Sequence, residues 1–169
     1  MSERGGLKQI LERRKDYFVK KLESAIYRPA VTTEWKGGLV NENRIRNHTI
    51  MSDYPVPSGG ADTAANPMEM VLAALGSCVS AVYVEYAAML DVPLEAVAVE
   101  LTGEIDLRGL FNVADVESGF KNISYKVRLK TSAPEEKVRE LIKLAGEHCP
   151  VSSTIKLPTA VAHEVTVEK

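Results

Sequence analysis

The chain has 169 residues, a formal net charge of −2, and a composition that is 45% hydrophobic and 26% charged. These values are typical of one folded domain of ordinary size, and they exclude a disordered chain, a collagen-like fibre and a disulfide-rich scaffold. A nucleic-acid-binding protein normally needs a basic face, so we expect no nucleic-acid partner.

The first 28 residues differ in charge from the rest, because they hold eight basic and four acidic residues. Apolar side chains recur there at helical spacing, which predicts a helix over about 7–26. We interpret residues 1–28 as a helical extension of a main domain at 29–169. A basic helix can lie on a membrane surface, but we favour packing on its own body or on a partner subunit. No apolar signal segment is visible, so we expect a cytoplasmic protein without stable membrane association.

Two strands and a long loop are expected next. Val31–Trp35 has the composition of a short strand, and Leu39–Met51 has a weak period of two. The pattern predicts a second strand that pairs with the first as a hairpin. Residues 52–66 are rich in proline, glycine and alanine. They form a loop that is long enough to be functional rather than merely connecting.

The most apolar segment of the chain follows this loop. Asn66-Pro67 predicts a helix start, because asparagine caps helices well and proline suits the first helical position. The helix should continue to residue 89 or 90. Its uncharged stretch, residues 70–84, is shorter than the about 20 residues of a membrane span, so we expect a buried core helix. Small residues crowd around Cys78 in this helix, which indicates that another backbone approaches it closely.

The remaining elements alternate between strand and helix patterns. Pro134 begins a helix that continues to about Glu147, and Cys149-Pro150 interrupts it before a further turn at 151–155. Period-two patterns predict three strands, namely Ala96–Leu107, Phe120–Lys130 and Val161–Val167. Because the helices and strands do not follow a βαβ order, we predict an α+β fold. Its mostly antiparallel sheet should be covered on one face by the helix that carries Cys78.

The two cysteines, Cys78 and Cys149, are the candidates for chemistry. In a cytosolic protein such a pair is more often redox-active or metal-binding than a permanent disulfide, while two unrelated buried thiols are the alternative. Cys149 lies at a helix break, where a transient disulfide can form more easily than in mid-helix. His148 and His163 would complete a zinc set, but no C-x-x-C or H-x-x-x-H spacing is present. We therefore expect no metal and no bound cofactor.

Two segments resemble motifs of the OsmC/Ohr family. Residues 66–78, NPMEMVLAALGSC, are similar to the family's N-P-x-E-x-L-x-A-A-x-G-x-C helix, with Val71 in place of the leucine. Residues 149–152, CPVS, look like its second motif, C-P-[VY]-S. The resemblance covers residues 31–168 and leaves the N-terminal helix outside the family core, as in some subgroups. It implies an intertwined homodimer in which mostly antiparallel sheets wrap around two central helices.

The resemblance also implies a thiol-dependent peroxidase that reduces organic hydroperoxides. In the family, the helix cysteine becomes a sulfenic acid, the second cysteine condenses with it to a disulfide, and an external dithiol, often a lipoyl group, restores the pair. Carried over to this sequence, Cys78 is the peroxidatic residue and Cys149 the resolving residue. The characterised peroxidases place a glutamate directly after N-P, where this chain has Met68, so Glu69 is the candidate acid here.

The family's peroxidases also use an arginine to stabilise the thiolate. The loop 51–66 has no arginine, and Arg44 and Arg46 on the predicted second strand are the nearest candidates, with a solvated strand face as the alternative. Glu85, two helical turns after Cys78, is a further possible acid. These departures keep two other hypotheses open. One is a protein of this fold without peroxidase activity that binds an apolar ligand or a partner at the dimer-interface cleft, and the other is a purely structural dimer.

Overall fold

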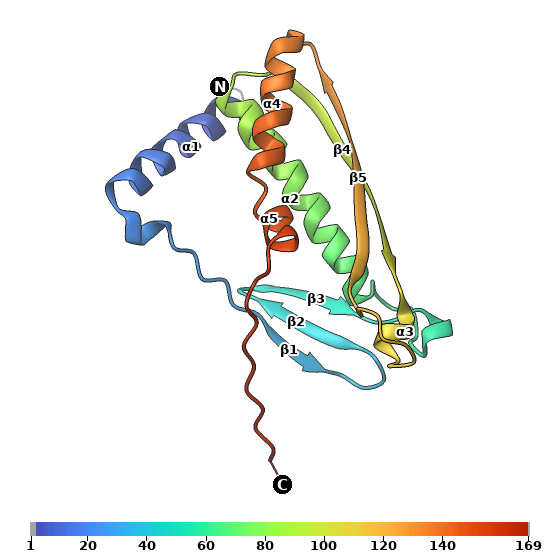
Figure 1. Cartoon of the computed structure of the whole chain (residues 1–169). Coiled ribbons are helices and arrows are strands. Elements are labelled where there is room, and N and C mark those ends of the chain that lie inside the picture. The colour runs from blue at the N-terminus through green and yellow to red at the C-terminus, as the bar shows by residue number, and fades with distance from the viewer. Residues whose placement is uncertain (1–2, 169) are drawn as a thin grey trace.

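The long helix α2 (Pro67–Met89) lies at the centre of the fold in the computed structural model, which describes residues 3–168 (Figure 1). The antiparallel hairpin of β4 (Leu94–Ile105) and β5 (Phe120–Thr131) runs along one side of it. Helices α4 (Glu135–Glu147) and α5 (Pro150–Lys156) pack against α2 as well. The α+β class, the antiparallel pairing and the central Cys78 helix are therefore confirmed.

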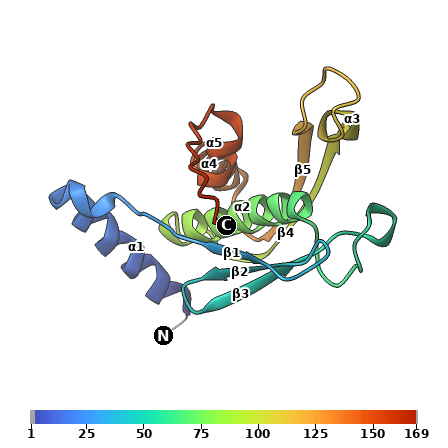
Figure 2. The ribbon, with the colours of Figure 1, turned by 90° about the horizontal axis from the view of Figure 1, so that it is seen from below.

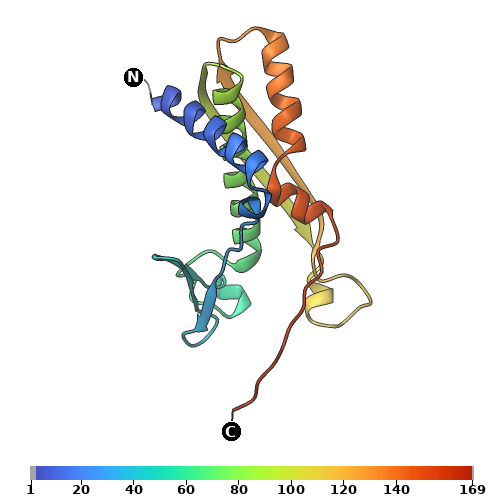
Figure 3. The ribbon, with the colours of Figure 1, turned by 90° about the vertical axis from the view of Figure 1, so that its left-hand side faces the viewer.

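The N-terminal third of the chain adds a helix and a second sheet. Helix α1 (Glu3–Lys20) and a short 3₁₀ turn (Leu22–Ala25) replace the single helix predicted over 7–26. Helix α1 packs on α2 (Figure 3). The side chain of Lys8 forms an ion pair with Asp91, which lies just after the C-terminal end of α2. The helix thus packs on its own body, and the predicted domain boundary after residue 28 stays a prediction.

The predicted strand over Leu39–Met51 is wrong, because the structure has two strands there. The antiparallel sheet contains β1 (Thr32–Trp35), β2 (Asn41–Ile45) and β3 (His48–Ser52). Ile45 pairs with His48, so the chain reverses over two residues, and Arg46 takes a left-handed backbone with φ 56°. Non-glycine residues seldom adopt that conformation. The turn also contains no glycine or proline, so its residue types did not predict a chain reversal here.

Two further expectations are corrected by the structure. The strands form two separate sheets, β1-β2-β3 and β4-β5, rather than one. The last strand, predicted over Val161–Val167, has no regular structure, and its segment runs away from the body (Figures 1 and 3). An alternating sequence forms a strand only where another strand satisfies its backbone groups. The described chain offers this segment no such neighbour.

The core lies between α2, the β4–β5 hairpin and α4. Helix α4 directs Leu141 and Ala145, which are four residues apart, onto α2, and Leu141 has no exposed surface. The other buried apolar residues come mainly from α2 and the start of β4: Leu75, Val79, Val82, Tyr83, Ala87, Val92 and Leu94. By length and composition α2 is also the one helix of residues 3–168 that could cross a membrane, but the core helices of many proteins pass the same test. Figure 2 shows α4 and α5 on one side of α2 and the β1–β3 sheet on the other.

The loop before α2 is organised around one buried carboxylate. Asp53 has no exposed surface, and it accepts hydrogen bonds from the backbone N–H groups of Tyr54, Ala61 and Thr63 and from the Thr63 hydroxyl, at 2.7–3.1 Å. The N–H groups of Thr63 and Tyr54 contribute most to lowering the pKa of Asp53 from 3.8 to about 2. The charged carboxylate therefore holds the two ends of this loop together.

We predict that Asp53→Ala loosens the loop over 53–66. Because the pKa of Asp53 is lower in the folded chain, its stabilising effect is present above pH 3.8 and is lost as the pH falls through about 2. The wild-type protein should therefore lose stability between these pH values more steeply than the variant. Thermal unfolding as a function of pH measures this difference, and limited proteolysis should cut the variant's loop faster at pH 7. Identical acid limbs for both proteins would contradict the prediction.

Candidate functional site

The two cysteines lie side by side although 71 positions separate them in the sequence. The Cys149 thiol donates a hydrogen bond to the Cys78 sulfur, and the two sulfur atoms are 3.4 Å apart. Both cysteines are free, with Cys78 half-buried in the middle of α2 and Cys149 only 2% exposed. A small movement of either side chain would bring the sulfurs to the about 2.05 Å of a disulfide bond.

The break between α4 and α5 aims Cys149 at α2. Leu141 and Ala145 fix α4 on α2, and α4 ends at Glu147. Cys149 is the N-cap of α5, and Pro150 follows at the first helical position, where its missing N–H costs no hydrogen bond. The chain therefore turns at this point, and the Cys149 side chain enters the core instead of continuing the α4 surface.

Burial dominates the electrostatics of Cys78. Desolvation raises the pKa of its thiol above the ordinary value, and the Cys149 thiol and the Glu85 charge raise it further. The backbone N–H of Val151, in the first turn of α5, donates a hydrogen bond to the sulfur and opposes these effects. Among the groups of residues 3–168 that shift this pKa none is a cation, so the chain by itself favours the neutral thiol.

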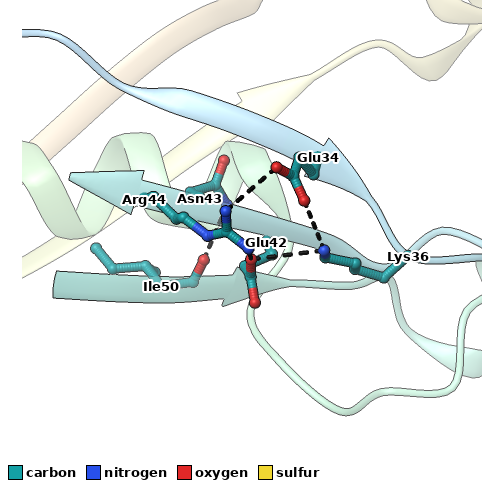
Figure 4. A network of polar contacts seen from close by, with 6 residues as sticks. All are labelled: Glu34, Lys36, Glu42, Asn43, Arg44 and Ile50. Carbon is teal, nitrogen blue, oxygen red and sulfur yellow. Dashed lines mark hydrogen bonds and ion pairs between the residues drawn. The ribbon is translucent and has the colours of Figure 1, made fainter. Parts of the chain in front are cut away.

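Arg44 belongs to an ion-pair network that joins β1 and β2 (Figure 4). Its Nη2 lies 2.5 Å from Glu42 Oε1 and its Nη1 lies 3.3 Å from Glu34 Oε1, while Lys36 Nζ lies 2.7 Å from Glu34 Oε2. The neighbouring residues Asn41 and Asn43 line a cavity together with Pro67 and Met70 of α2. Since side chains alternate along a strand, Arg44 is on the face of the sheet that is turned away from α2.

Arg46 is placed differently. It occupies the exposed turn between β2 and β3, and it forms no ion pair with any of the residues that the structure describes. Its guanidinium is therefore available to a group outside this chain, whereas that of Arg44 already has two carboxylate partners.

Glu69 caps the helix that carries Cys78. Its Oε2 accepts a hydrogen bond from the Asn66 N–H at 2.8 Å, while Asn66 Oδ1 accepts from the N–H groups of Met68 and Glu69. This reciprocal pair is a capping box, which satisfies N–H groups that the first turn leaves unpaired. The structure thus brings Cys78 and Cys149 together, and it places Glu69, Arg44 and Arg46 elsewhere within the chain.

The fold also creates two features that the sequence did not predict. The ring of His148 stacks on Tyr86 of α2, with centroids 5.6 Å apart. A cavity of about 270 Å³ lies beside α5, and Lys121 and Lys156 are among the residues that line it. No sequence signal points to either feature, because each joins segments that are far apart along the chain. Within residues 3–168 no group of three or more His, Cys, Asp or Glu side chains gathers as metal ligands would.

A protein-family model matches more than half of the chain. The OsmC family model, described as OsmC-like protein, matches residues 59–164. None of the curated proteins matches the chain significantly.

Solved structures share the fold at low sequence identity. An OsmC-like protein from Mycoplasma pneumoniae is 17% identical, with a TM-score of 0.66 over 77% of this chain and 88% of its own. An organic hydroperoxide resistance protein OsmC from Legionella pneumophila is 21% identical, with a TM-score of 0.59 over 78% and 91%. An organic hydroperoxide resistance protein from Elizabethkingia anophelis is 20% identical, with a TM-score of 0.56 over 78% and 90%. At these identities the likeness shows the fold alone.

Two variants at the start of α2 separate capping from chemistry. Glutamine at the third helical position preserves a capping box, so Glu69→Gln should keep both the thermal stability and the reactivity of Cys78 near wild type. Asn66→Ala should lower the free energy of unfolding by about 1 kcal/mol, as loss of an N-cap usually does. Urea unfolding measures the stability, and alkylation by iodoacetamide measures the thiol. A large loss of thiol reactivity in a stable Glu69→Gln protein would instead give this carboxylate a chemical role.

Proposed function

The chain belongs to the OsmC-like family, and we propose that it is a thiol-dependent peroxidase that reduces organic hydroperoxides through Cys78 and Cys149. The observation that carries this proposal is the 3.4 Å separation of the two sulfur atoms in the reduced protein. Two thiols that meet across a helix break are arranged to form a disulfide after one oxidation event. The names of the structural relatives from Legionella and Elizabethkingia point to the same chemistry.

The reaction follows from the geometry of the pair. The Cys78 thiolate attacks the outer oxygen of the hydroperoxide, so an S–O bond forms, the O–O bond breaks, and the leaving alkoxide takes a proton to become the alcohol. Cys149 then attacks the sulfenic sulfur of Cys78, the S–S bond forms, and water leaves. Because Cys149 is already in hydrogen-bond contact, the second step outruns further oxidation. An external dithiol, of the lipoyl type, reduces the disulfide by exchange and leaves the protein without a bound cofactor.

We further propose that the working form is a homodimer. One face of α2 is exposed in the single chain although it consists of small and apolar residues, namely Val71, Ala74, Ser77, Ala81 and Val84. Small residues at spacings of three and four allow two helices to approach closely. The unpaired segment 161–167 and the free edges of both sheets offer further surface to a second copy.

The dimer would also supply the missing cation. Burial raises the pKa of Cys78, and a peroxidase needs the thiolate at neutral pH. Arg46 lies on an exposed turn and forms no ion pair with residues 3–168 of its own chain. We therefore assign to Arg46 of a second copy the role of stabilising the Cys78 thiolate, and we place this chemistry in the reducing cytoplasm.

Single substitutions of the cysteines should separate the two steps. Cys78→Ser should abolish turnover, whereas Cys149→Ser should allow one oxidation per chain and then stop. Thiol titration before and after one equivalent of cumene hydroperoxide, with mass spectrometry of the products, should show two thiols lost and a Cys78–Cys149 link in the wild type. Two unreacted thiols in the wild type would contradict the proposal and would favour a ligand-binding protein of the same fold.

The two arginines of β2 and its turn provide a matched pair of variants. In a Cys149→Ser background, Arg46→Gln should slow the alkylation of Cys78 at pH 7 by about tenfold, because each unit of increase in a thiol pKa removes about nine-tenths of the thiolate. Arg44→Gln should leave the rate unchanged, since that guanidinium is held by Glu34 and Glu42. The pH dependence of iodoacetamide alkylation gives the pKa directly. Equal rates for both variants would remove Arg46 from the mechanism.

A further inference from the structure

A cavity of about 270 Å³ lies between β5 and α5, and both apolar side chains and two lysines line it. Its apolar lining consists of Leu75 of α2, Phe120 and Ile123 of β5, and Ile155 of α5. Lys121, near the start of β5, and Lys156, the last residue of α5, supply its positive charge. A cavity that combines apolar side chains with positive charge suits an amphipathic anion.

This cavity adjoins the two cysteines through both helices that carry them. Leu75 precedes Cys78 by three positions on α2, and Ser152 follows Cys149 by three positions at the start of α5. Three helical positions, about 4.5 Å along the axis, therefore separate each of these wall residues from the cysteine on the same helix. Both wall residues are almost fully buried. The cavity wall therefore includes residues from the same turns of α2 and α5 that position the two sulfur atoms.

The positive charges that line the cavity suit a ligand with a single negative charge. Asp106 accepts hydrogen bonds from Arg108, its Oδ2 lies 3.2 Å from Lys121 Nζ, and Arg108 chiefly keeps the pKa of Asp106 well below the ordinary value. Asp106, Arg108 and Lys121 together carry one net positive charge. The Arg108 guanidinium is the group best suited to bind a phosphate, but it is already hydrogen-bonded to Asp106. Lys156 adds a positive charge that has no ion partner within residues 3–168.

We propose that this cavity binds the carboxylate end of a medium-length acyl chain, with Lys156 and Lys121 as the residues that recognise the charge. A lysine ammonium pairs with a monoanion as a point charge, and burial of the chain against Leu75, Ile123 and Ile155 supplies the apolar contribution. The binding of the chain stands by itself. Its consequence, that hydroperoxides bearing a carboxylate are preferred to neutral ones, rests on the peroxidase activity proposed above.

Octanoate and the uncharged 1-octanol, titrated into the full-length reduced protein by calorimetry, test the binding site. Wild-type protein should bind octanoate at least about tenfold more tightly than octanol, and added salt should reduce this difference. Lys156→Gln should weaken octanoate about tenfold and leave octanol unchanged, with a smaller effect of Lys121→Gln because Asp106 shares that ammonium. Lys126→Gln, an exposed lysine of β5 outside the cavity, is the matched control and should change neither ligand. Equal octanoate affinity in the wild type and Lys156→Gln proteins would overturn the proposal.

Kinetics separate the failure of this site from that of the proposed reaction. With a hydroperoxide of octanoate as substrate, Lys156→Gln should raise KM and leave kcat unchanged, and with cumene hydroperoxide it should alter neither. If octanoate binds through Lys156 but no hydroperoxide is turned over, the peroxidase proposal fails and the binding site remains. If turnover is normal and Lys156→Gln has no selective effect on the carboxylate substrate, the site has no part in specificity.

Discussion

The packing of α4 on α2 is the constraint on which the rest of the site depends. Leu141 and Ala145 bury the inner face of α4 against the central helix, and the chain then breaks at Cys149-Pro150. A buried leucine contributes about 2 kcal/mol or more to the free energy of unfolding, so this contact is not easily displaced. Because α4 is fixed, the break that follows it turns one particular side chain toward the middle of α2. That side chain is Cys149, and it meets Cys78 at 3.4 Å.

The same burial that joins the sulfurs also works against their ionisation. A thiol in apolar surroundings resists losing its proton, and Glu85 adds a negative charge nearby, so the pKa of Cys78 is raised. The N–H of Val151 offsets part of this effect, and it reaches the sulfur only because α5 begins beside α2. Proximity and activation are thus separate requirements. The single chain meets the first, and a second copy bearing Arg46 would meet the second.

The single chain exposes several segments whose composition is typical of a protein interior. The small and apolar face of α2, the unpaired segment 161–167 and the open sheet edges all have the composition of buried structure and the exposure of a surface. The side chains of Val161, Val165 and Val167 are 76–87% exposed. The cavity beside α5 differs from these features, because its lysines are charged groups that are suited to solvent, and Leu75 and Ile123 in its lining belong to the core of one chain.

The sequence by itself determined the elements whose signals are local. Asn66-Pro67 and the apolar run specified α2, Pro150 specified the break, and the alternation of apolar and polar residues specified β4 and β5, since caps, proline and periodicity act within a few residues. The turn at Arg46 could not be predicted from the sequence, because Arg46 adopts a left-handed backbone conformation that is rare for arginine. Only the tertiary structure brought Cys78 to Cys149, placed Arg44 among carboxylates and made Lys121 and Lys156 line the same cavity. Contacts between residues that are far apart along the chain depend on how buried faces pack together, and no local pattern contains that information.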